Sequence, residues 1–434
     1  MPRPTASRLV ALALFALFAL AAAKIWVRPL FVPREHRGDV LFGHYHLVDV
    51  YRGLPILLVT VALALVVLAP ARLRKPIGHR AFAVVLGILV PFFAVDIGWS
   101  LFWVGARTPA YWLDEAHISR LQNEPDPELG FVRKPNIEWE GAPGDVEAAI
   151  HYRTDANGFH NPPDVGDDVD IVFLGDSYTE AAQVDEGDCF ARLVGRELGR
   201  SVVNLGRGAY GPPQELIVLR RFGLGYTPDV VVWQLFEGND LGDAQKFVEW
   251  RDDPHRVTRS IEERYVHNSL LKPLFDATTR VRHRVFLRLE GDDRRFRLRY
   301  RFDPTYADVK ARGLEATLDA LREGAALCRE NGARLIVLYL PIMLRVYGPW
   351  IRFEDEADRA RCDPEVDGER RGWAAPIAAA CDELGVEFLD VTPTFRAHAA
   401  ADRSNGLYIR TDEHLTRTGH EVVRDALVER LRGG

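Results

Sequence analysis

The sequence predicts an α/β protein: a three-layer α/β/α sandwich around a five-stranded parallel sheet, preceded by an N-terminal helical transmembrane region. Two observations lead to this prediction. Residues 9–104 are strongly apolar and the rest of the 434-residue chain is mixed, which separates a membrane region from a globular domain. In that domain, short apolar runs rich in β-formers alternate with stretches of helical periodicity. This alternation is typical of a parallel sheet covered by helices on both faces.

Three apolar stretches occupy the membrane region, at about 9–27, 53–69 and 81–104. A spanning helix needs roughly 20 largely apolar residues, so the third fits best and the second is slightly short. The first follows Arg3 and Arg8, so it is either a retained helix or a cleaved signal peptide. With either alternative, and with the weak bias of basic residues, everything after residue 104 is expected on the outer or periplasmic face of an inner (cytoplasmic) membrane.

Asp96 is the one charged residue inside the third apolar stretch. A carboxylate in hydrocarbon is costly, so it marks either a polar contact or relay, or a position near the interface. Trp99 and Trp103 follow it, and tryptophans favour membrane interfaces. We therefore interpret Asp96 as an interfacial residue.

Residues 105–165 are rich in Pro, Gly, Asp and Asn and are expected to be a linker and an irregular lead-in to a domain at 166–434. Residues 241–304 contain many arginines, aspartates and aromatics with no clear strand, so we expect an insertion that is either a lid over the site or a decoration. Strands are expected at 170–174, 202–205, 230–236, 335–340 and 387–391, and helices at 190–198, 214–222, 307–331, 372–384 and 416–431.

The tripeptide Gly175-Asp176-Ser177 directly follows the first expected strand. A serine between a strand and a helix is raised above the edge of the sheet, where backbone N–H groups can face an oxyanion. The alternative is an ordinary turn and helix cap. In parallel sheets the chemistry gathers where the strands end, which favours the serine as a nucleophile.

Four segments in order resemble the sequence blocks of the SGNH/GDSL hydrolase superfamily. Segment 171–180 is similar to the first block, 204–211 to the second, 237–240 to the third and 412–414 to the last. The resemblance covers roughly residues 168–432 without the insertion, and it says nothing about the membrane region. It implies the SGNH/flavodoxin-like fold and a serine esterase with an acyl-enzyme intermediate.

The resemblance also implies the roles of individual residues. Ser177 is expected to be the nucleophile, His414 its general base and Asp412 the group that orients the imidazole. His420 lies nearby in the sequence and is the rival candidate for the base. The oxyanion hole is expected to use the backbone of Ser177, Gly208 and Ala209 together with the Asn239 amide.

The chain departs from the family pattern at two positions. The second block normally has a glycine donor five residues after its asparagine, and this chain has Ala209 there, so the donor is either Ala209 or Gly208. Asp412 stands two residues before His414, where many members have three. The same Asp-x-His spacing occurs in relatives that O-acetylate exopolysaccharides.

We therefore expect a membrane-tethered esterase that acts on an acyl ester of an envelope glycan or lipid. The alternatives are an O-acyltransferase that modifies a cell-surface polysaccharide and a non-enzymatic envelope-binding module. None of the four cysteines forms a CxxC pair, and we expect no metal or cofactor. The net charge of -7 gives no reason to expect nucleic acid, so the expected partners are the ester substrate and membrane lipid.

Overall fold

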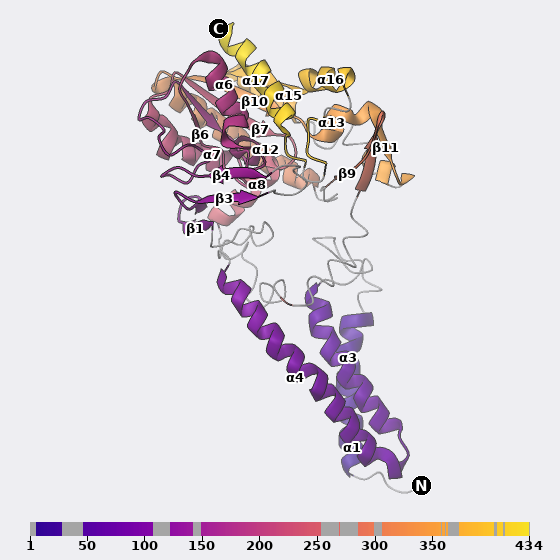
Figure 1. Cartoon of the computed structure of the whole chain (residues 1–434). Helices are drawn as coiled ribbons and strands as arrows, with labels where there is room; N and C mark the ends of the chain where they lie inside the picture. The colour runs from indigo at the N-terminus through magenta and orange to yellow at the C-terminus, as the bar shows by residue number, and fades with distance from the viewer. Residues whose placement is uncertain are drawn as a thin grey trace. The chain divides into compact units, whose positions relative to one another are not determined.

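The structure is a computed structural model of the chain, and it divides into two compact units that are described separately. One unit is built from the N-terminal helices and the other is the α/β unit (Figure 1). The residues that the structure describes are 6–27, 47–106, 122–141, 149–252, 269, 285–298, 306–356, 358–360, 362, 373–402, 406–410 and 413–433.

In the part of the helical unit that the structure describes, three apolar helices are present. Helix α1 is followed by a π-helical turn η1, α1 packs against α3, and α3 packs against α4. Parts of α3 and α4, Val50–Leu68 and Pro76–Asp96, are long and apolar enough to cross a membrane, and Leu12–Val27 is shorter. The elements are α1 (Ala6–Ala22), η1 (Ala23–Val27), α3 (Leu47–Leu68), η2 (Ala71–Leu73) and α4 (Arg74–Ala106).

Asp96 makes a polar contact between two of these helices. Its carboxylate is buried and accepts a hydrogen bond of 2.7 Å from the Tyr51 hydroxyl. A polar side chain in apolar surroundings is much less costly when it is hydrogen-bonded. The structure thus favours the polar contact that we set aside for Asp96 in the sequence, since local spacing could not reveal a partner 45 positions away.

A five-stranded, wholly parallel sheet forms the centre of the α/β unit, as predicted. The strand order is β12-β10-β7-β5-β6, which places β5 between β6 and β7. The strands are β5 (Ile171–Leu174), β6 (Val202–Asn204), β7 (Val230–Phe236), β10 (Arg334–Leu340) and β12 (Glu387–Asp390).

Helices cover both faces of this sheet, and successive residues along each strand alternate between the two hydrophobic cores. Ile171 and Phe173 pack with α6 and α17, whereas Val172 and Leu174 pack with the helices of the opposite layer. Figure 1 shows these layers on either side of the sheet. The helices are α6 (Phe190–Leu198) and α17 (Arg417–Arg432) on one face, and α7 (Pro212–Val218), α8 (Asp240–Asp252), α12 (Tyr306–Glu330) and α15 (Ala374–Leu384) on the other.

The expected lead-in is more ordered than the sequence indicated. Two antiparallel strand pairs form within it, and Phe131 and Phe159 lie in the hydrophobic core of the α/β unit. Each strand has only four residues between turns, which is too short for an alternating pattern to stand out. The pairs are β1 (Asn123–Asp126) with β2 (Gly130–Arg133), and β3 (Glu138–Gly141) with β4 (Ile150–Arg153).

The expectation that 241–304 has no strand is wrong. It contains a hairpin, β8 (Val285–Leu289) and β9 (Asp292–Leu298), which is extended by β11 (Ile351–Phe353). The hairpin turns at Gly291, whose φ of 85° is readily adopted by glycine. Arginines stand between the apolar residues of these strands, so the alternating apolar pattern of a strand is hard to detect in the sequence. Residues 253–268 and 270–284 lie outside the described part of the chain, so a lid over the site stays a prediction.

The remaining described elements are short helices that connect these layers. They are α5 (Ser177–Glu180), η4 (Glu186–Asp188), η5 (Leu219–Gly223), η6 (Leu224–Tyr226), α13 (Met343–Tyr347), η8 (Gly348–Trp350) and α16 (Thr392–Ala401).

Candidate active site

The candidate site lies at the carboxyl ends of three neighbouring strands. The turn after β5 carries Ser177, the turn after β6 carries Gly208 and Ala209, and the turn after β7 carries Asn239. Because the strands are parallel and adjacent, these turns meet at one edge of the sheet. The sequence could predict this convergence because each motif directly follows its strand.

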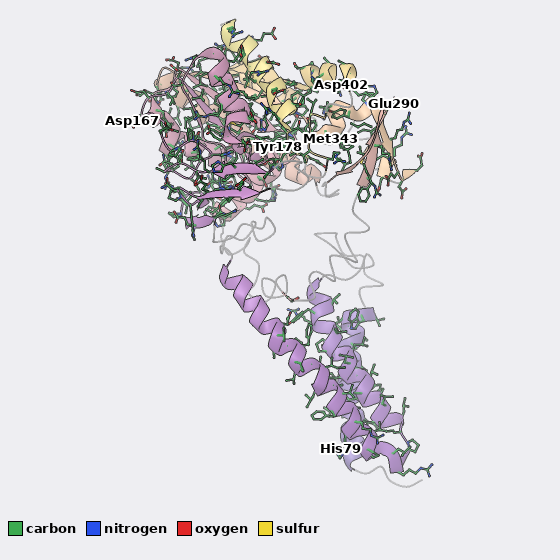
Figure 2. The ribbon with its side chains drawn as sticks, viewed as in Figure 1. His79, Asp167, Tyr178, Glu290, Met343 and Asp402 are labelled. Atoms are coloured by element: carbon green, nitrogen blue, oxygen red, sulfur yellow. The ribbon has the colours of Figure 1, made fainter. Side chains whose placement is uncertain are left out.

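Ser177 is the first residue of the short helix α5, and Asp176 caps that helix. The Asp176 carboxylate accepts a hydrogen bond of 2.9 Å from the Tyr178 N–H. Tyr178 lies inside the α/β unit (Figure 2). Its ring stacks on Phe236, with ring centroids 3.8 Å apart. The cap and this stacking together fix the turn that presents the serine hydroxyl.

His414 is the imidazole that reaches the serine. Its Nε2 lies 2.8 Å from the Ser177 Oγ, which is hydrogen-bonding distance. The loop that carries His414 is held by two contacts: the Tyr178 hydroxyl donates to the Glu413 carbonyl at 2.7 Å, and the Ile409 N–H donates to the His414 carbonyl at 2.8 Å. The residue after the serine thus anchors the loop of the histidine.

Asp412, the expected partner of the imidazole, lies outside the described residues. Its position relative to His414 therefore stays a prediction from the sequence. The described residues after it support the predicted local structure, because Thr416 caps α17 and accepts a hydrogen bond of 3.2 Å from the Gly419 N–H.

The Asn239 amide lies beside the serine turn and is held by two carboxylates. Its Nδ2 donates to Asp176 at 3.2 Å and to Asp243, one turn along α8, at 2.7 Å. An amide nitrogen has two hydrogens, so both are in use. One of these bonds has to yield before the amide can donate to a substrate oxygen, and the longer one to Asp176 is the weaker.

Asp176 is fully buried, and burial raises the pKa of its carboxyl to about 6. The hydrogen bonds from the Tyr178 N–H and the Asn239 amide, and the nearness of His414, act in the opposite direction. One carboxylate oxygen of Asp176 accepts from the Tyr178 N–H and the other from the Asn239 amide. The sequence interpretation did not assign it a role.

Gly208 and Ala209 differ in what their backbones do. The Gly208 N–H donates to the carboxylate of Glu180 at 2.6 Å. Ala209 adopts a φ of 66°, a left-handed conformation that is uncommon for residues other than glycine. Glu180, Asp176 and Asp243 were not predicted as site residues. A sequence signal existed only for Asp176 and Glu180, since both belong to the motif around the serine, one position before it and three positions after it.

His420, the rival base, is a buried structural histidine. Its Nδ1 accepts a hydrogen bond of 3.3 Å from the Phe190 N–H, and its ring stacks on Phe190. Burial, assisted by the nearby histidines His414 and His160, lowers the pKa of His420 to about 3. The ring is therefore neutral at neutral pH.

This lowered pKa makes His420 a source of acid sensitivity. Between pH 6.5 and 3 the unfolded chain protonates this histidine and the folded chain does not. The stability that it contributes above pH 6.5 is therefore lost as the pH falls toward 3, by up to about 1.4 kcal/mol per pH unit. We predict that His420→Asn, whose oxygen can still accept from Phe190, flattens the pH dependence of the unfolding free energy over this range. Urea unfolding at several pH values measures this slope, and equal slopes for variant and wild type would contradict the prediction.

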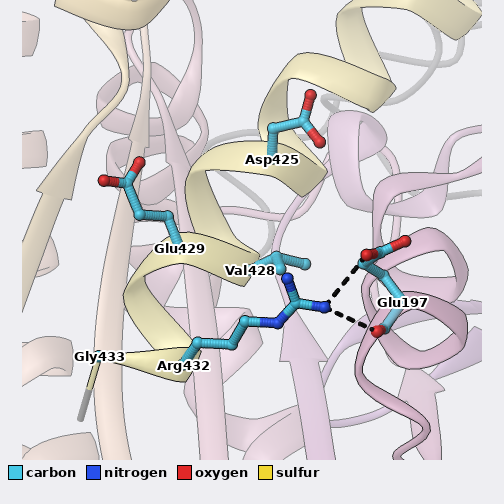
Figure 3. A pocket seen from close by; sticks show the side chains of 6 residues that line it. All are labelled: Glu197, Asp425, Val428, Glu429, Arg432 and Gly433. Atoms are coloured by element: carbon cyan, nitrogen blue, oxygen red, sulfur yellow. Dashed lines mark hydrogen bonds and ion pairs between the residues drawn. The ribbon is translucent and has the colours of Figure 1, made fainter.

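Two surface hollows among the described residues lie away from this edge of the sheet. One is formed by the carboxyl ends of α6 and α17, where Arg432 pairs with Glu197 across the hollow (Figure 3). The other is lined by residues before β5 and by α6. Neither contains Ser177, His414 or Asn239, so we do not assign the chemistry to them.

Comparison with known proteins gives a family match and several similar solved structures. The model of the GDSL-like Lipase/Acylhydrolase family matches residues 173–422. No curated protein matches the chain. Similar solved structures include the acetyl xylan esterase AlAXEase, with 12% identity over 60% of this chain and 99% of that chain and a TM-score of 0.34. TesA is 12% identical over 61% of this chain and 98% of its own chain, with a TM-score of 0.33. A GDSL-like lipase from Bacteroides thetaiotaomicron is 12% identical over 61% of this chain and 87% of its own chain, with a TM-score of 0.32.

Proposed function

Because the chain belongs to the GDSL-like lipase/acylhydrolase family and is a serine hydrolase of ester bonds, we propose that it is a membrane-tethered esterase with Ser177 as its nucleophile. The substrate that we propose is an acyl ester of an envelope glycan or lipid. The observation that carries the proposal is the 2.8 Å contact between the Ser177 Oγ and the His414 Nε2. This contact is what proton transfer from the serine to a general base requires.

The proposed reaction proceeds in two acyl-transfer steps. His414 Nε2 takes the serine proton while the Ser177 Oγ attacks the ester carbonyl carbon, and the carbonyl oxygen becomes an oxyanion. Backbone N–H groups and the Asn239 amide stabilise this oxyanion. The intermediate then expels the alcohol, which receives the proton from His414, and leaves the acyl group on Ser177. Water attacks the acyl-enzyme in the same way and releases the acid. Asp412 is proposed to hold the imidazole by its other nitrogen.

The apolar helices support membrane tethering. Two segments in α3 and α4 have the length and composition of membrane spans. We propose that the α/β unit lies on the outer face of the membrane. A C-terminal reporter that is active only outside the cytoplasm, such as alkaline phosphatase, is expected to be active, and activity of a cytoplasm-specific reporter alone would contradict this topology.

A second candidate function is O-acyl transfer to a sugar hydroxyl. The observation in its favour is the Asp-x-His spacing of Asp412 and His414, which resembles that of exopolysaccharide O-acetylating relatives. Both functions share the acyl-enzyme and differ only in the acceptor that resolves it.

One experiment tests the proposed function and separates the two candidates. The purified chain in detergent is incubated with p-nitrophenyl acetate, with and without an oligosaccharide acceptor. An esterase releases p-nitrophenol and acetate at the same rate in both, whereas a transferase acetylates the oligosaccharide and turns over faster when it is present. If the chain neither turns over the ester nor shows an acetylated Ser177 by mass spectrometry, the proposed function is wrong.

A further inference from the structure

Glu180 is a buried carboxylate three positions after the nucleophile. Its side chain is 4% exposed, and each of its oxygens has two donors. Oε1 accepts from the Arg133 guanidinium and from the Tyr152 hydroxyl at 2.7 Å. Oε2 accepts from Arg207 at 3.1 Å and from the Gly208 N–H at 2.6 Å. All four lone-pair directions of the carboxylate are therefore in use.

The carboxylate is ionised in this setting. Burial by itself would raise the pKa of Glu180, but the charges of Arg133 and Arg207 and the hydrogen bonds from Tyr152 and Gly208 hold it well below its usual range. A buried charge with two cationic partners and full hydrogen bonding is rigid, because any movement leaves a charge unpaired.

The fourth donor connects Glu180 to the turn after β6, which faces the nucleophile. A Cβ atom at Gly208 would lie 2.8 Å from the Glu180 Oε2 and 3.4 Å from the Ser177 Cβ, so this backbone lies against both residues. Because the Gly208 N–H is held by Glu180, it is not available to a substrate oxygen. The Ala209 N–H, in contrast, has no hydrogen-bond partner among the described residues.

We propose that Glu180 is a positioning residue of the oxyanion hole. Its carboxylate occupies the Gly208 N–H and fixes the turn, so that the Ala209 N–H is the backbone donor of that turn to the oxyanion. The left-handed φ of 66° at Ala209 is the conformation that this arrangement imposes on a residue other than glycine. This inference rests on the proposed esterase function.

The same arrangement gives the short strand pairs before β5 a role in the site. Arg133 is the last residue of β2, and Tyr152 belongs to β4. Both reach Glu180 from segments that precede the serine motif, and the Arg133 guanidinium also lies 5.2 Å from the centre of the Tyr152 ring. These strands thus complete the support of the oxyanion turn from outside the five-stranded sheet.

Single-atom changes of the backbone test which N–H is the donor. Replacing the amide N–H of Ala209 with an ester oxygen, by incorporation of the α-hydroxy acid, is expected to lower kcat for p-nitrophenyl acetate roughly 10²- to 10³-fold with little change in KM, the usual effect of losing one oxyanion donor. The same replacement at Gly208 removes the hydrogen bond to Glu180 but no oxyanion donor, so it is expected to lower kcat about as much as Glu180→Ala does and by less than the replacement at Ala209. Equal losses, or a larger loss at Gly208, would overturn the assignment.

Side-chain variants test Glu180 itself against a matched control. Glu186 is also a largely buried carboxylate that pairs with two arginines, Arg153 and Arg192, but it does not contact the turn of Gly208. We expect Glu180→Ala to lower kcat by roughly tenfold or more, but by no more than the loss of one whole oxyanion donor would. We expect Glu186→Ala to leave kcat near the wild-type value. Glu180→Gln, which keeps an acceptor for Gly208, should retain more activity than Glu180→Ala and serves if the alanine variant does not fold.

Thermal unfolding and active-site labelling complete the design. Both alanine variants are expected to lower the melting temperature, so a loss of kcat only in the Glu180 variants identifies positioning rather than stability. Wild-type kcat in Glu180→Ala, or an equal loss in Glu186→Ala, would refute the role of Glu180. If the wild type neither hydrolyses the ester nor labels at Ser177 with a fluorophosphonate, the proposed function fails instead.

Discussion

Replacing His414 with alanine is expected to reduce kcat for a chromogenic acetyl ester by several orders of magnitude, on the order of 10⁶ as for bases of other serine hydrolases. The Ser177 hydroxyl is a poor nucleophile at neutral pH, and His414 is the group whose Nε2 lies within 2.8 Å of it. Without that base the serine proton has no nearby acceptor, so only the contribution of the oxyanion hole and of substrate binding remains.

The control for this experiment is the second histidine on the same segment. His420 is buried against Phe190 with its pKa lowered to about 3, so its ring neither reaches the serine nor exchanges protons at neutral pH. His420→Asn is expected to keep most of the wild-type kcat while it alters the acid stability. Steady-state kinetics of both variants on p-nitrophenyl acetate decide the matter. A loss at His420 as large as that at His414 would refute the assignment of the base.

The second large effect is expected from Asn239→Ala, which removes the side-chain donor of the oxyanion hole. Losing one such donor typically lowers kcat by about 10² to 10³, or roughly 2.7–4 kcal/mol of transition-state stabilisation. KM should change little, because the oxyanion exists only in the transition state and the tetrahedral intermediate. The prediction is checked by measuring kcat and KM separately.

Asn331→Ala is a suitable control for this variant. The Asn331 amide is exposed at the end of α12 and donates only to its own helix, to the Leu327 carbonyl at 2.8 Å. We expect wild-type kinetics from it. If Asn239→Ala raises KM and leaves kcat unchanged, the amide binds the ground state, and its assignment to the oxyanion hole is wrong.

Much of the fold could be predicted from the sequence because its signals are local. The apolar runs at 171–174 and 230–236 are β-rich, fully buried strands, and the helices between the strands carry apolar residues at helical spacing. Once such elements alternate, a parallel sheet and the gathering of strand ends at one edge follow from general rules. This explains why Ser177, Gly208 and Asn239 could be assigned to one site. The short strands β1–β4 and the arginine-rich hairpin could not be predicted, because their alternation of apolar and polar residues is brief or interrupted by charged residues.

The sequence by itself therefore determined the layered α/β architecture and the apolar N-terminal helices, and it predicted the pairing of Ser177 with His414 that the structure brings within 2.8 Å. Only the tertiary structure decided how the groups around them are used. Glu180 meets Arg133 across 47 positions, Tyr178 meets Glu413 across 235, and Tyr51 meets Asp96 across 45. Spacing along the chain carries no information about such pairs, because they form only when separate elements pack together. The choice between Gly208 and Ala209 depends on the hydrogen bond from the Gly208 N–H to Glu180. The choice between His414 and His420 depends on the contact of His414 with Ser177 and on the hydrogen bond from the Phe190 N–H to His420.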